Sequence, residues 1–152
     1  MKERKEIKIP PIKEGIVIDH IPKNHVLRVA QILAVGKEEG MVTIGMNLMS
    51  NKLKSKDVIK IEGRDLTDSE INKISIIAPE ATVSFIKEYR IEEKLQVRLP
   101  KKVSKIVKCS NPRCITRHQD VPTLFHVVNK KPLRLKCHYC EKTISRKEIE
   151  LI

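Results

Sequence analysis

The sequence predicts an α+β protein of two domains, a β-α-β-β-α-β sandwich over residues 1–99 and a small all-β metal domain over residues 100–152. Three observations support this prediction. Strand and helix signals alternate over the first hundred residues. A capping-box motif marks the start of the second predicted helix. All four cysteines lie in the last third of the chain, in two pairs.

A strand and a helix are the first expected elements. The stretch Gly15-Ile-Val-Ile-Asp-His20 follows a glycine turn and is rich in β-branched residues, and Pro22 ends it. Asn24 is placed to cap a helix over roughly residues 25–35, with Gly36 as its C-terminal signal. The buried face of this helix would carry Val26, Ala30 and Leu33.

Two strands and a second helix come next. Residues 41–49 alternate with period two, and residues 57–62 form the following strand. Thr67 and Glu70 form the capping box, and Leu66 and Ile71 are placed for a hydrophobic staple. The alternation puts Val42, Ile44, Met46 and Leu48 on one face. The helix is expected to bury Ile71, Ile74, Ile77 and Ala78.

A long β-rich stretch over residues 82–97 completes the first domain. The resulting order is typical of a ferredoxin-like sandwich, in which one antiparallel sheet carries two helices on one face. Strand signal gives way to proline and charge at Leu99-Pro-Lys-Lys102, where we place the boundary. The second domain is expected to be a zinc-ribbon-like (rubredoxin-like) fold with short strands over residues 103–108, 123–128, 133–136 and 143–149.

The two cysteine pairs are Cys109-Ser-Asn-Pro-Arg-Cys114 and Cys137-His-Tyr-Cys140. Their spacing indicates a metal site more strongly than four unrelated buried thiols. Four thiolates suit tetrahedral Zn²⁺ and leave no open position for water or substrate. We therefore predict one structural zinc ion per chain. Iron is the alternative ion, and His118 and His138 are expected to be hydrogen-bonded or solvated side chains outside the ligand set.

The net charge of +12 is unevenly distributed. From Pro100 onward there are 13 Lys and Arg against 4 Asp and Glu, a net of +9, whereas residues 1–99 carry 18 against 15. A basic metal domain is typical of nucleic-acid-binding proteins, so that function is open at this point. Basic side chains beside the thiolates also offset the negative charge of a four-thiolate centre, and the excess could face an acidic protein.

The composition excludes several other classes. No apolar run approaches the roughly 18 residues of a membrane span. Residues 1–6 are charged and lack the apolar core of a signal peptide. Paired cysteines in such a chain indicate metal ligands rather than disulfides, so we expect a cytoplasmic protein that does not bind membranes. The sequence contains no Gly-rich phosphate loop, G-x-S-x-G or H-E-x-x-H motif, which argues against an enzyme.

Asp19, His20, Lys60 and Lys94 are the polar residues of the first domain that could bind a ligand. Neighbouring strand residues point to opposite faces, so Asp19 and His20 are expected to make separate contacts rather than form a dyad. Lysines on an open sheet face usually meet solvent. Two lysines and a histidine on neighbouring strands could also surround a phosphorylated anion.

Five segments together resemble the regulatory chain of aspartate carbamoyltransferase, the allosteric enzyme that opens pyrimidine biosynthesis. They lie in the same order, span nearly the whole chain and include the second cysteine pair. The segments are Gly15-Ile-Val-Ile-Asp-His-Ile-Pro22, Val42-Thr-Ile-Gly-Met-Asn-Leu48, Lys56-Asp-Val-Ile-Lys-Ile-Glu62, Ala78-Pro-Glu-Ala-Thr-Val83 and Cys137-His-Tyr-Cys-Glu-Lys142.

The resemblance implies a non-catalytic subunit with an N-terminal nucleotide-binding domain and a zinc domain. In this family CTP inhibits and ATP activates through one shared site. Regulatory chains form homodimers through their N-terminal domains, and their zinc domains dock on separate catalytic chains. Three such dimers join two catalytic trimers. The resemblance thus favours protein and nucleotide partners over nucleic acid.

The resemblance also implies residue roles. Backbone groups of Ile12 and Tyr89 would contact the base, Asp19 and Lys60 would lie near the ribose and base, and His20 and Lys94 would meet the phosphates. The pocket would be lined by Val17, Ile86 and Ile91, with Ser84 where asparagine is usual. The residues expected near the catalytic-chain interface are Asn111, Tyr139 and Glu141, beside Arg113, which replaces a small polar residue.

Two rival functions remain. A nucleic-acid-binding zinc ribbon fits the basic segment, but only Phe125 and Tyr139 there offer stacking surfaces, on which single-strand recognition usually relies. An iron-thiolate electron carrier would be coloured.

Overall fold

Two compact units make up the chain, Met1–Arg98 and Leu99–Ile152. The computed structural model describes residues 11–51 and 54–152. The charged segment at residues 1–6, which argues against a signal peptide, lies outside the described residues. None of the helices found within those two ranges has the length and apolar character needed to cross a membrane.

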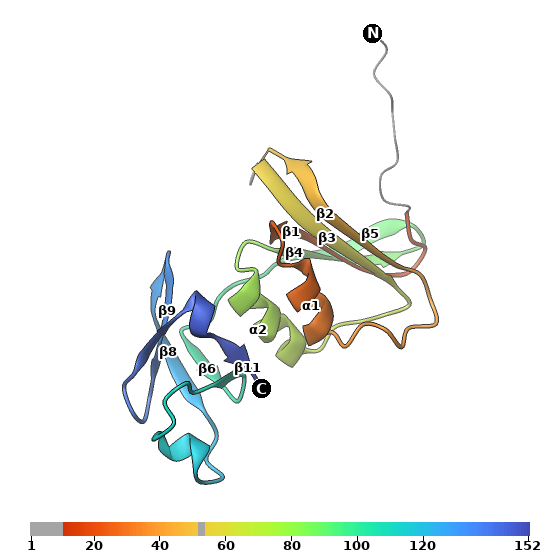
Figure 1. Ribbon diagram of the computed structural model, residues 1–152. Helices are drawn as coiled ribbons and strands as arrows, with labels where there is room; N and C mark the ends of the chain where they lie inside the picture. Colours follow the sequence, from red (N-terminus) through yellow and green to blue (C-terminus); the bar gives the residue numbers. More distant parts are fainter. Residues whose placement is uncertain (1–10, 52–53) are drawn as a thin grey trace. The chain divides into compact units, whose positions relative to one another are not determined.

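The first unit is an antiparallel five-stranded sheet with two helices, and its strands lie in the order β2-β3-β1-β4-β5 (Figure 1). The order and pairing of the first four strands are those of a ferredoxin-like sandwich, which confirms the predicted fold class. The elements are β1 Gly15–Pro22, α1 Val26–Ile32, β2 Val42–Ser50, β3 Lys54–Glu62, α2 Asp68–Ile77, β4 Thr82–Lys87 and β5 Arg90–Gln96.

The sheet has one covered face and one open face. Helices α1 and α2 lie together on the covered face (Figure 1). The strand residues that face them are fully buried aliphatic side chains, Ile16, Ile18, Ile59, Ile61 and Val83. Burying each contributes about 1.5–3 kcal/mol, so an aliphatic core suffices where aromatic residues are scarce. The residues between them in sequence point to the open face.

Helix α2 begins with the predicted capping box. The Glu70 N–H donates to Thr67 Oγ1 at 3.2 Å, and the Thr67 N–H donates to Glu70 Oε1 at 3.0 Å. The helix buries Ile74 and Ile77 as expected, whereas Ile71 is only half-buried. The local sequence therefore determines the start of this helix.

Helix α1 is shorter than predicted and has a different cap. It spans Val26–Ile32 rather than residues 25–35, because Ala34 adopts a left-handed conformation with φ 51° before Gly36 is reached. Asn24 does not cap it. The carboxylate of Asp57 on β3 instead accepts the His25 and Val26 N–H groups, a long-range contact that no local pattern reveals.

The prediction that Val42, Ile44, Met46 and Leu48 share one face is wrong. The β2–β3 register shifts between Gly45 and Leu48, so two residues of β2 lie opposite Asp57 of β3. Leu48 therefore pairs with Lys56 and points to the open face, whereas Ile44 pairs with Ile59 on the covered face.

The expected β-rich stretch over residues 82–97 is a hairpin of two strands, not one element. Glu88 and Tyr89 form its turn, with φ of 52° and 63°. Turns of this kind usually contain Asn or Gly, so Glu-Tyr gave no turn signal in the sequence. The hairpin adds β5 to the edge of the sheet.

The second unit contains a four-stranded sheet in the order β10-β9-β8-β6 and a two-stranded sheet of β11 and β7. Residues 103–108 form two strands because Lys105 is left-handed, with φ 61°, and the strand expected over residues 143–149 ends at Ser145. The elements are β6 Lys102–Ser104, β7 Val107–Lys108, η1 Ile115–Arg117, β8 Leu124–Lys130, β9 Leu133–Cys137, β10 Thr143–Ser145, η2 Arg146–Glu148 and β11 Glu150–Leu151.

Candidate functional sites: a four-cysteine cluster and a cavity on the open sheet face

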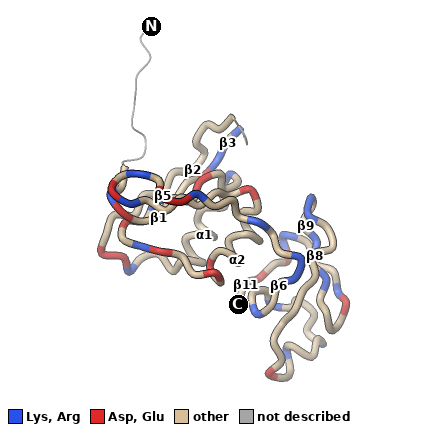
Figure 2. Tube along the Cα trace, turned by 180° about the vertical axis from the view of Figure 1, so that it is seen from behind, with Lys and Arg blue, Asp and Glu red and all other residues tan. Residues whose placement is uncertain are grey.

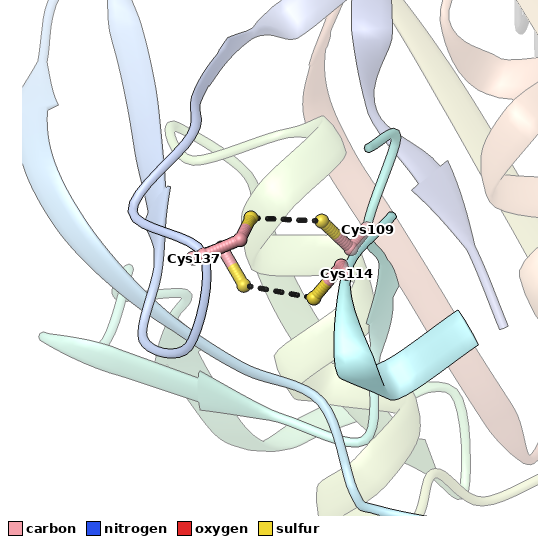
Figure 3. A group of neighbouring side chains, drawn as sticks. Cys109, Cys114 and Cys137 are labelled. Carbon is pink, nitrogen blue, oxygen red and sulfur yellow. Dashed lines mark hydrogen bonds between the residues drawn. The ribbon is translucent and has the colours of Figure 1, made fainter. Parts of the chain in front are cut away.

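The four cysteines converge as predicted. Cys109 follows β7, Cys114 precedes η1, Cys137 ends β9 and Cys140 lies in the turn after it. Their sulfur atoms all lie within 4.8 Å of one another, and Sγ–Sγ distances are 3.6 Å for Cys109–Cys140 and 3.7 Å for Cys114–Cys137 (Figure 3). A tetrahedral ion with Zn–S bonds of about 2.3 Å requires sulfur separations of about 3.8 Å. The cluster therefore fits a structural metal ion such as zinc.

Hydrogen bonds around the cluster fix its two hairpins. Thr116 Oγ1 donates to Cys114 Sγ at 3.2 Å, and Arg117 Nη1 donates to the Cys109 carbonyl at 3.0 Å. The Cys137 N–H donates to the Lys142 carbonyl at 2.9 Å. Such contacts orient metal ligands and balance the charge of thiolates.

Burial raises the pKa of the Cys109 thiol to about 12 and also raises the pKa of Cys137. Burial acts in the same direction on Cys140, but hydrogen bonds from the Lys142 backbone and from the side chains of Asn111, Cys109 and Cys137 together outweigh it and lower that pKa to about 7. Cys109 and Cys137 therefore resist ionisation without a cation, so metal binding must displace their protons.

His118 and His138 are hydrogen-bonded neighbours of the cluster, as predicted. His118 Nε2 lies 2.6 Å from the Pro112 carbonyl, and His138 Nδ1 lies 3.0 Å from His126 Nε2. The group of ligand atoms found in the described part of the chain contains the four cysteines and neither histidine.

The open face of the first unit's sheet contains a cavity of about 380 Å³. Register places Lys60, Val17, Ser84 and Lys94 side by side on β3, β1, β4 and β5. Strand spacing separates the Cα atoms of the two lysines by about 14 Å, with Val17 and Ser84 between them. The lining residues are Val17, Asp19, Leu48, Lys56, Val58, Lys60, Thr82, Ser84, Ile86, Ile91 and Lys94.

Asp19 and His20 lie in a bulge of β1. The β1–β3 register shifts between Ile18 and Ile21, and His20 is left-handed with φ 58°. His20 Nδ1 lies 3.1 Å from Oγ1 of Thr82, which pairs with Asp19. Both side chains therefore reach the open face, and the prediction that they point to opposite faces is wrong because it assumed a regular strand.

Lys56 links this cavity to a neighbouring hollow of about 340 Å³, which His20 lines with Met49, Ser50 and Asn51. Lys56 Nζ lies 2.9 Å from Asp19 Oδ1. Burial lowers the pKa of Lys60, and the nearby Asp19 carboxylate partly opposes that shift. The cavity thus combines three ammonium groups with one carboxylate.

Seven of the ten residues expected in a nucleotide site line the cavity, and His20 lines the adjoining hollow. Ile12 is buried, and Tyr89 lies exposed in the β4–β5 turn, where its N–H donates to the Lys13 carbonyl at 3.0 Å. These two line neither hollow. The residues that the sequence did not suggest are Leu48, Lys56, Val58 and Thr82.

Three of these four could have been found. Lys56 and Val58 alternate with Lys60 along β3, and Thr82 alternates with Ser84 along β4, so each shares the face of its partner. Leu48 could not, because the β2 bulge reverses its direction.

The three residues expected near a catalytic-chain interface surround the cysteine cluster. Asn111 belongs to the first hairpin, where its carbonyl accepts the Cys114 N–H at 3.0 Å and its side chain accepts the Arg113 N–H at 3.0 Å. Tyr139 and Glu141 are exposed in the second hairpin. The hairpins therefore carry these side chains on a surface whose shape depends on the cysteine cluster.

A larger hollow of about 920 Å³ lies in the second unit, beside Cys109 and the C-terminal strand β11. Its charged lining is mixed, and Lys108 Nζ lies 3.7 Å from Glu150 Oε1. Acidic and basic groups in one open hollow give no preference for an anion, so we assign no ligand to it.

The fold and the sites define a two-domain protein with a polar sheet cavity in one unit and a four-cysteine metal module in the other. Residues 7–98 match the family model "Aspartate carbamoyltransferase regulatory chain, allosteric domain", and residues 101–150 match the metal binding domain of the same family. The chain belongs to the family of aspartate carbamoyltransferase regulatory chains, which are non-catalytic subunits of that transferase.

The chain is similar to several proteins named aspartate carbamoyltransferase regulatory chain. The chain is 47% identical over 146 residues to that of Pyrococcus abyssi and 48% identical over 146 residues to that of Pyrococcus furiosus, covering 95% of this chain and 96% of each relative. It is 44% identical over 153 aligned positions to that of Bacteroides thetaiotaomicron, over the full length of both.

Proposed function

We propose that the open-face cavity binds CTP and ATP, which compete for one site and regulate catalytic chains of aspartate carbamoyltransferase in opposite directions. The observation that carries the proposal is the row of Lys60, Val17, Ser84 and Lys94 across four strands, with Lys56 beside it. Ammonium groups suit a triphosphate. The apolar side chains of Val17, Ile86 and Ile91 suit the base and ribose.

Regulation follows from unequal binding. A nucleotide can shift the equilibrium between two quaternary states of the enzyme only as far as the nucleotide's affinities for those two states differ. CTP would favour the less active state and ATP the more active one. The coupling is reciprocal and typically amounts to about 1–3 kcal/mol.

The metal module would serve as the docking unit. A zinc ion on the four cysteines would hold both hairpins in shape, and the exposed groups around it, Asn111, Tyr139 and Glu141, would meet the catalytic chain. The ion has no open coordination position for chemistry. Its contribution is to the fold of the docking surface, and regulation would take place with the enzyme in the cytoplasm.

A homodimer would form through the edge strand β2. This strand ends the five-stranded sheet, and among the described residues no other strand pairs with its outer side. Large apolar side chains near this edge are exposed by 39% at Ile44, 40% at Met46, 86% at Met49 and 56% at Leu27 on α1. An apolar edge of this kind supports isologous pairing with a second copy.

Calorimetric titration tests the nucleotide proposal. We expect CTP to bind the purified zinc-loaded chain saturably and ATP to displace it. The chain should also co-elute with the catalytic chain, and chelation should release it. Absence of CTP binding to both the free chain and the assembled complex would refute the nucleotide proposal.

Nucleic-acid binding is the second candidate function, and one observation favours it. Register places Lys102, His126 and Lys136 in one row across β6, β8 and β9, and Lys and Arg predominate over this unit (Figure 2). A single-stranded oligonucleotide bound with steep salt dependence would support this function. Anisotropy of a labelled oligonucleotide between low and physiological salt measures it.

A further inference from the structure

Asp57 is a fully buried carboxylate in the middle of β3. Its Oδ1 accepts the Asn47 N–H at 3.0 Å, and its Oδ2 accepts the His25 N–H at 3.0 Å and the Val26 N–H at 3.1 Å. No basic side chain in the described ranges forms an ion pair with it. A buried carboxylate is costly unless it is hydrogen-bonded, so three backbone donors account for its presence there.

The bond to Asn47 holds the bulge of β2. Asn47 is left-handed, with φ 59°, and is one of the two β2 residues opposite Asp57. A bulge residue drops out of the strand ladder, and its N–H then needs another acceptor. Asp57 Oδ1 is that acceptor.

The bulge decides which side chain forms one wall of the cavity. With it, Leu48 pairs with Lys56 and lines the cavity. Without it, the register that pairs Gly45 with Val58 would continue and bring Asn47 opposite Lys56. A slip of one residue turns every following side chain to the other face. The apolar Leu48 would then be replaced by an amide.

The other carboxylate oxygen holds the start of α1. This helix has no side-chain cap of its own, and the His25 and Val26 N–H groups converge on Asp57 Oδ2. One buried side chain thus fixes the edge strand, the first turn of α1 and a wall of the cavity together.

We infer that Asp57 is a positioning residue of the open-face cavity, because it holds the β2 bulge that places Leu48 rather than Asn47 opposite Lys56. The inference concerns the shape of the cavity and rests on the proposed function only where nucleotide binding is used as a readout.

The variant Asp57→Asn tests the inference without any ligand. The amide keeps the shape and one acceptor oxygen, but its NH₂ group faces a backbone N–H that it cannot accept. We expect cross-strand NMR contacts of Lys56 to move from Leu48 to Asn47 and exchange of the Asn47 amide to accelerate at least tenfold. The matched control is Asp65→Asn, which alters an exposed carboxylate whose hydrogen bond within the described ranges is to the adjacent Leu66 N–H.

Unchanged strand pairing and unchanged Asn47 exchange in a folded Asp57→Asn protein would overturn the inference. The unaltered chain provides a second test that does not depend on the variant folding. There the Asn47 amide should exchange as slowly as the neighbouring paired strand amides. Fast exchange of that amide would contradict the hydrogen bond and the inference with it.

A double-mutant cycle separates positioning from a general loss of stability. Leu48→Ala should weaken CTP binding several-fold in the native background and leave it unchanged in the Asp57→Asn background, where Leu48 no longer lines the cavity. Equal effects in both backgrounds would contradict the inference. If the unaltered chain does not bind CTP, the nucleotide proposal fails, and the ligand-free NMR comparison still decides the role of Asp57.

Discussion

The two units of the chain are stabilised by different means. The first packs two helices onto a five-stranded sheet through fully buried isoleucine and valine side chains, and α2 is capped by its own sequence. The second consists of short strands and two 3₁₀ turns around four cysteines. Domains this small bury little apolar surface and usually need a metal or disulfide. The comparison implies that metal loss should disable docking and leave the cavity intact.

Removing one metal ligand should have the largest effect. We expect Cys114→Ala to lose zinc and unfold residues 99–152, because metal binding in such modules supplies about 10 kcal/mol or more of folding free energy. Association with the catalytic chain should disappear. Hydrogen exchange and zinc content measure this, with His118→Ala as the matched control beside the cluster. A Cys114→Ala chain that retains zinc and still assembles would contradict the claim that the second unit depends on its metal ion.

Removing a cavity lysine should weaken nucleotide binding and spare assembly. Each charge-assisted hydrogen bond contributes about 1.5–3 kcal/mol, so Lys60→Ala and Lys94→Ala should each weaken CTP binding about tenfold to hundredfold. Calorimetry measures the affinity, and Lys37→Ala, an exposed lysine outside the cavity, is the control. Unchanged CTP affinity in both cavity variants would show that the nucleotide binds elsewhere.

Loss of the α2 cap should destabilise the first unit alone. Thr67→Ala removes the hydroxyl that accepts the Glu70 N–H, which typically costs about 1 kcal/mol. Chemical denaturation monitored in each unit should show a lower midpoint for the first and no change in the second. An equal shift of the denaturation midpoint in both units would mean that they unfold together, which would contradict the claim that they are stabilised separately.

The pH dependence of CTP binding should give the smallest effect. Burial lowers the pKa of Lys60, so the free chain loses this charge at a lower pH than an ordinary lysine does. A bound triphosphate favours the charged form. The affinity for CTP should therefore be constant at pH values below the pKa of Lys60 in the free chain, where this side chain is charged. It should fall as the pH rises through that pKa. In Lys60→Arg the fall in CTP affinity at alkaline pH should vanish. If the fall persists in that variant, another group causes it.

Local patterns predicted the parts of the fold that depend on neighbours in sequence. Thr67 and Glu70 marked the start of α2, and the cysteine spacing predicted the cluster. The cap of α1 could not be predicted in this way, because Asp57 lies more than thirty residues along the chain from the His25 and Val26 N–H groups that it accepts.

The cavity was predictable only in part. Lys60 and Lys94 follow from their strands, whereas the placement of His20 and Leu48 depends on two bulges, one on each side of β3. A bulge reverses the direction of the side chains that follow it, and no pattern of period two encodes it. The local sequence therefore named Asp19, Lys60 and Lys94 but neither Lys56 nor the way in which these residues converge.

Hydrogen exchange of the zinc-loaded chain, with CTP added before and after chelation, tests whether the two units fold and bind their ligands separately. We expect chelation to remove protection from residues 99–152, while CTP continues to protect β1, β3 and β4 with its affinity changed by less than about twofold. Loss of CTP protection together with the metal would contradict the claim that the two units fold and bind their ligands separately.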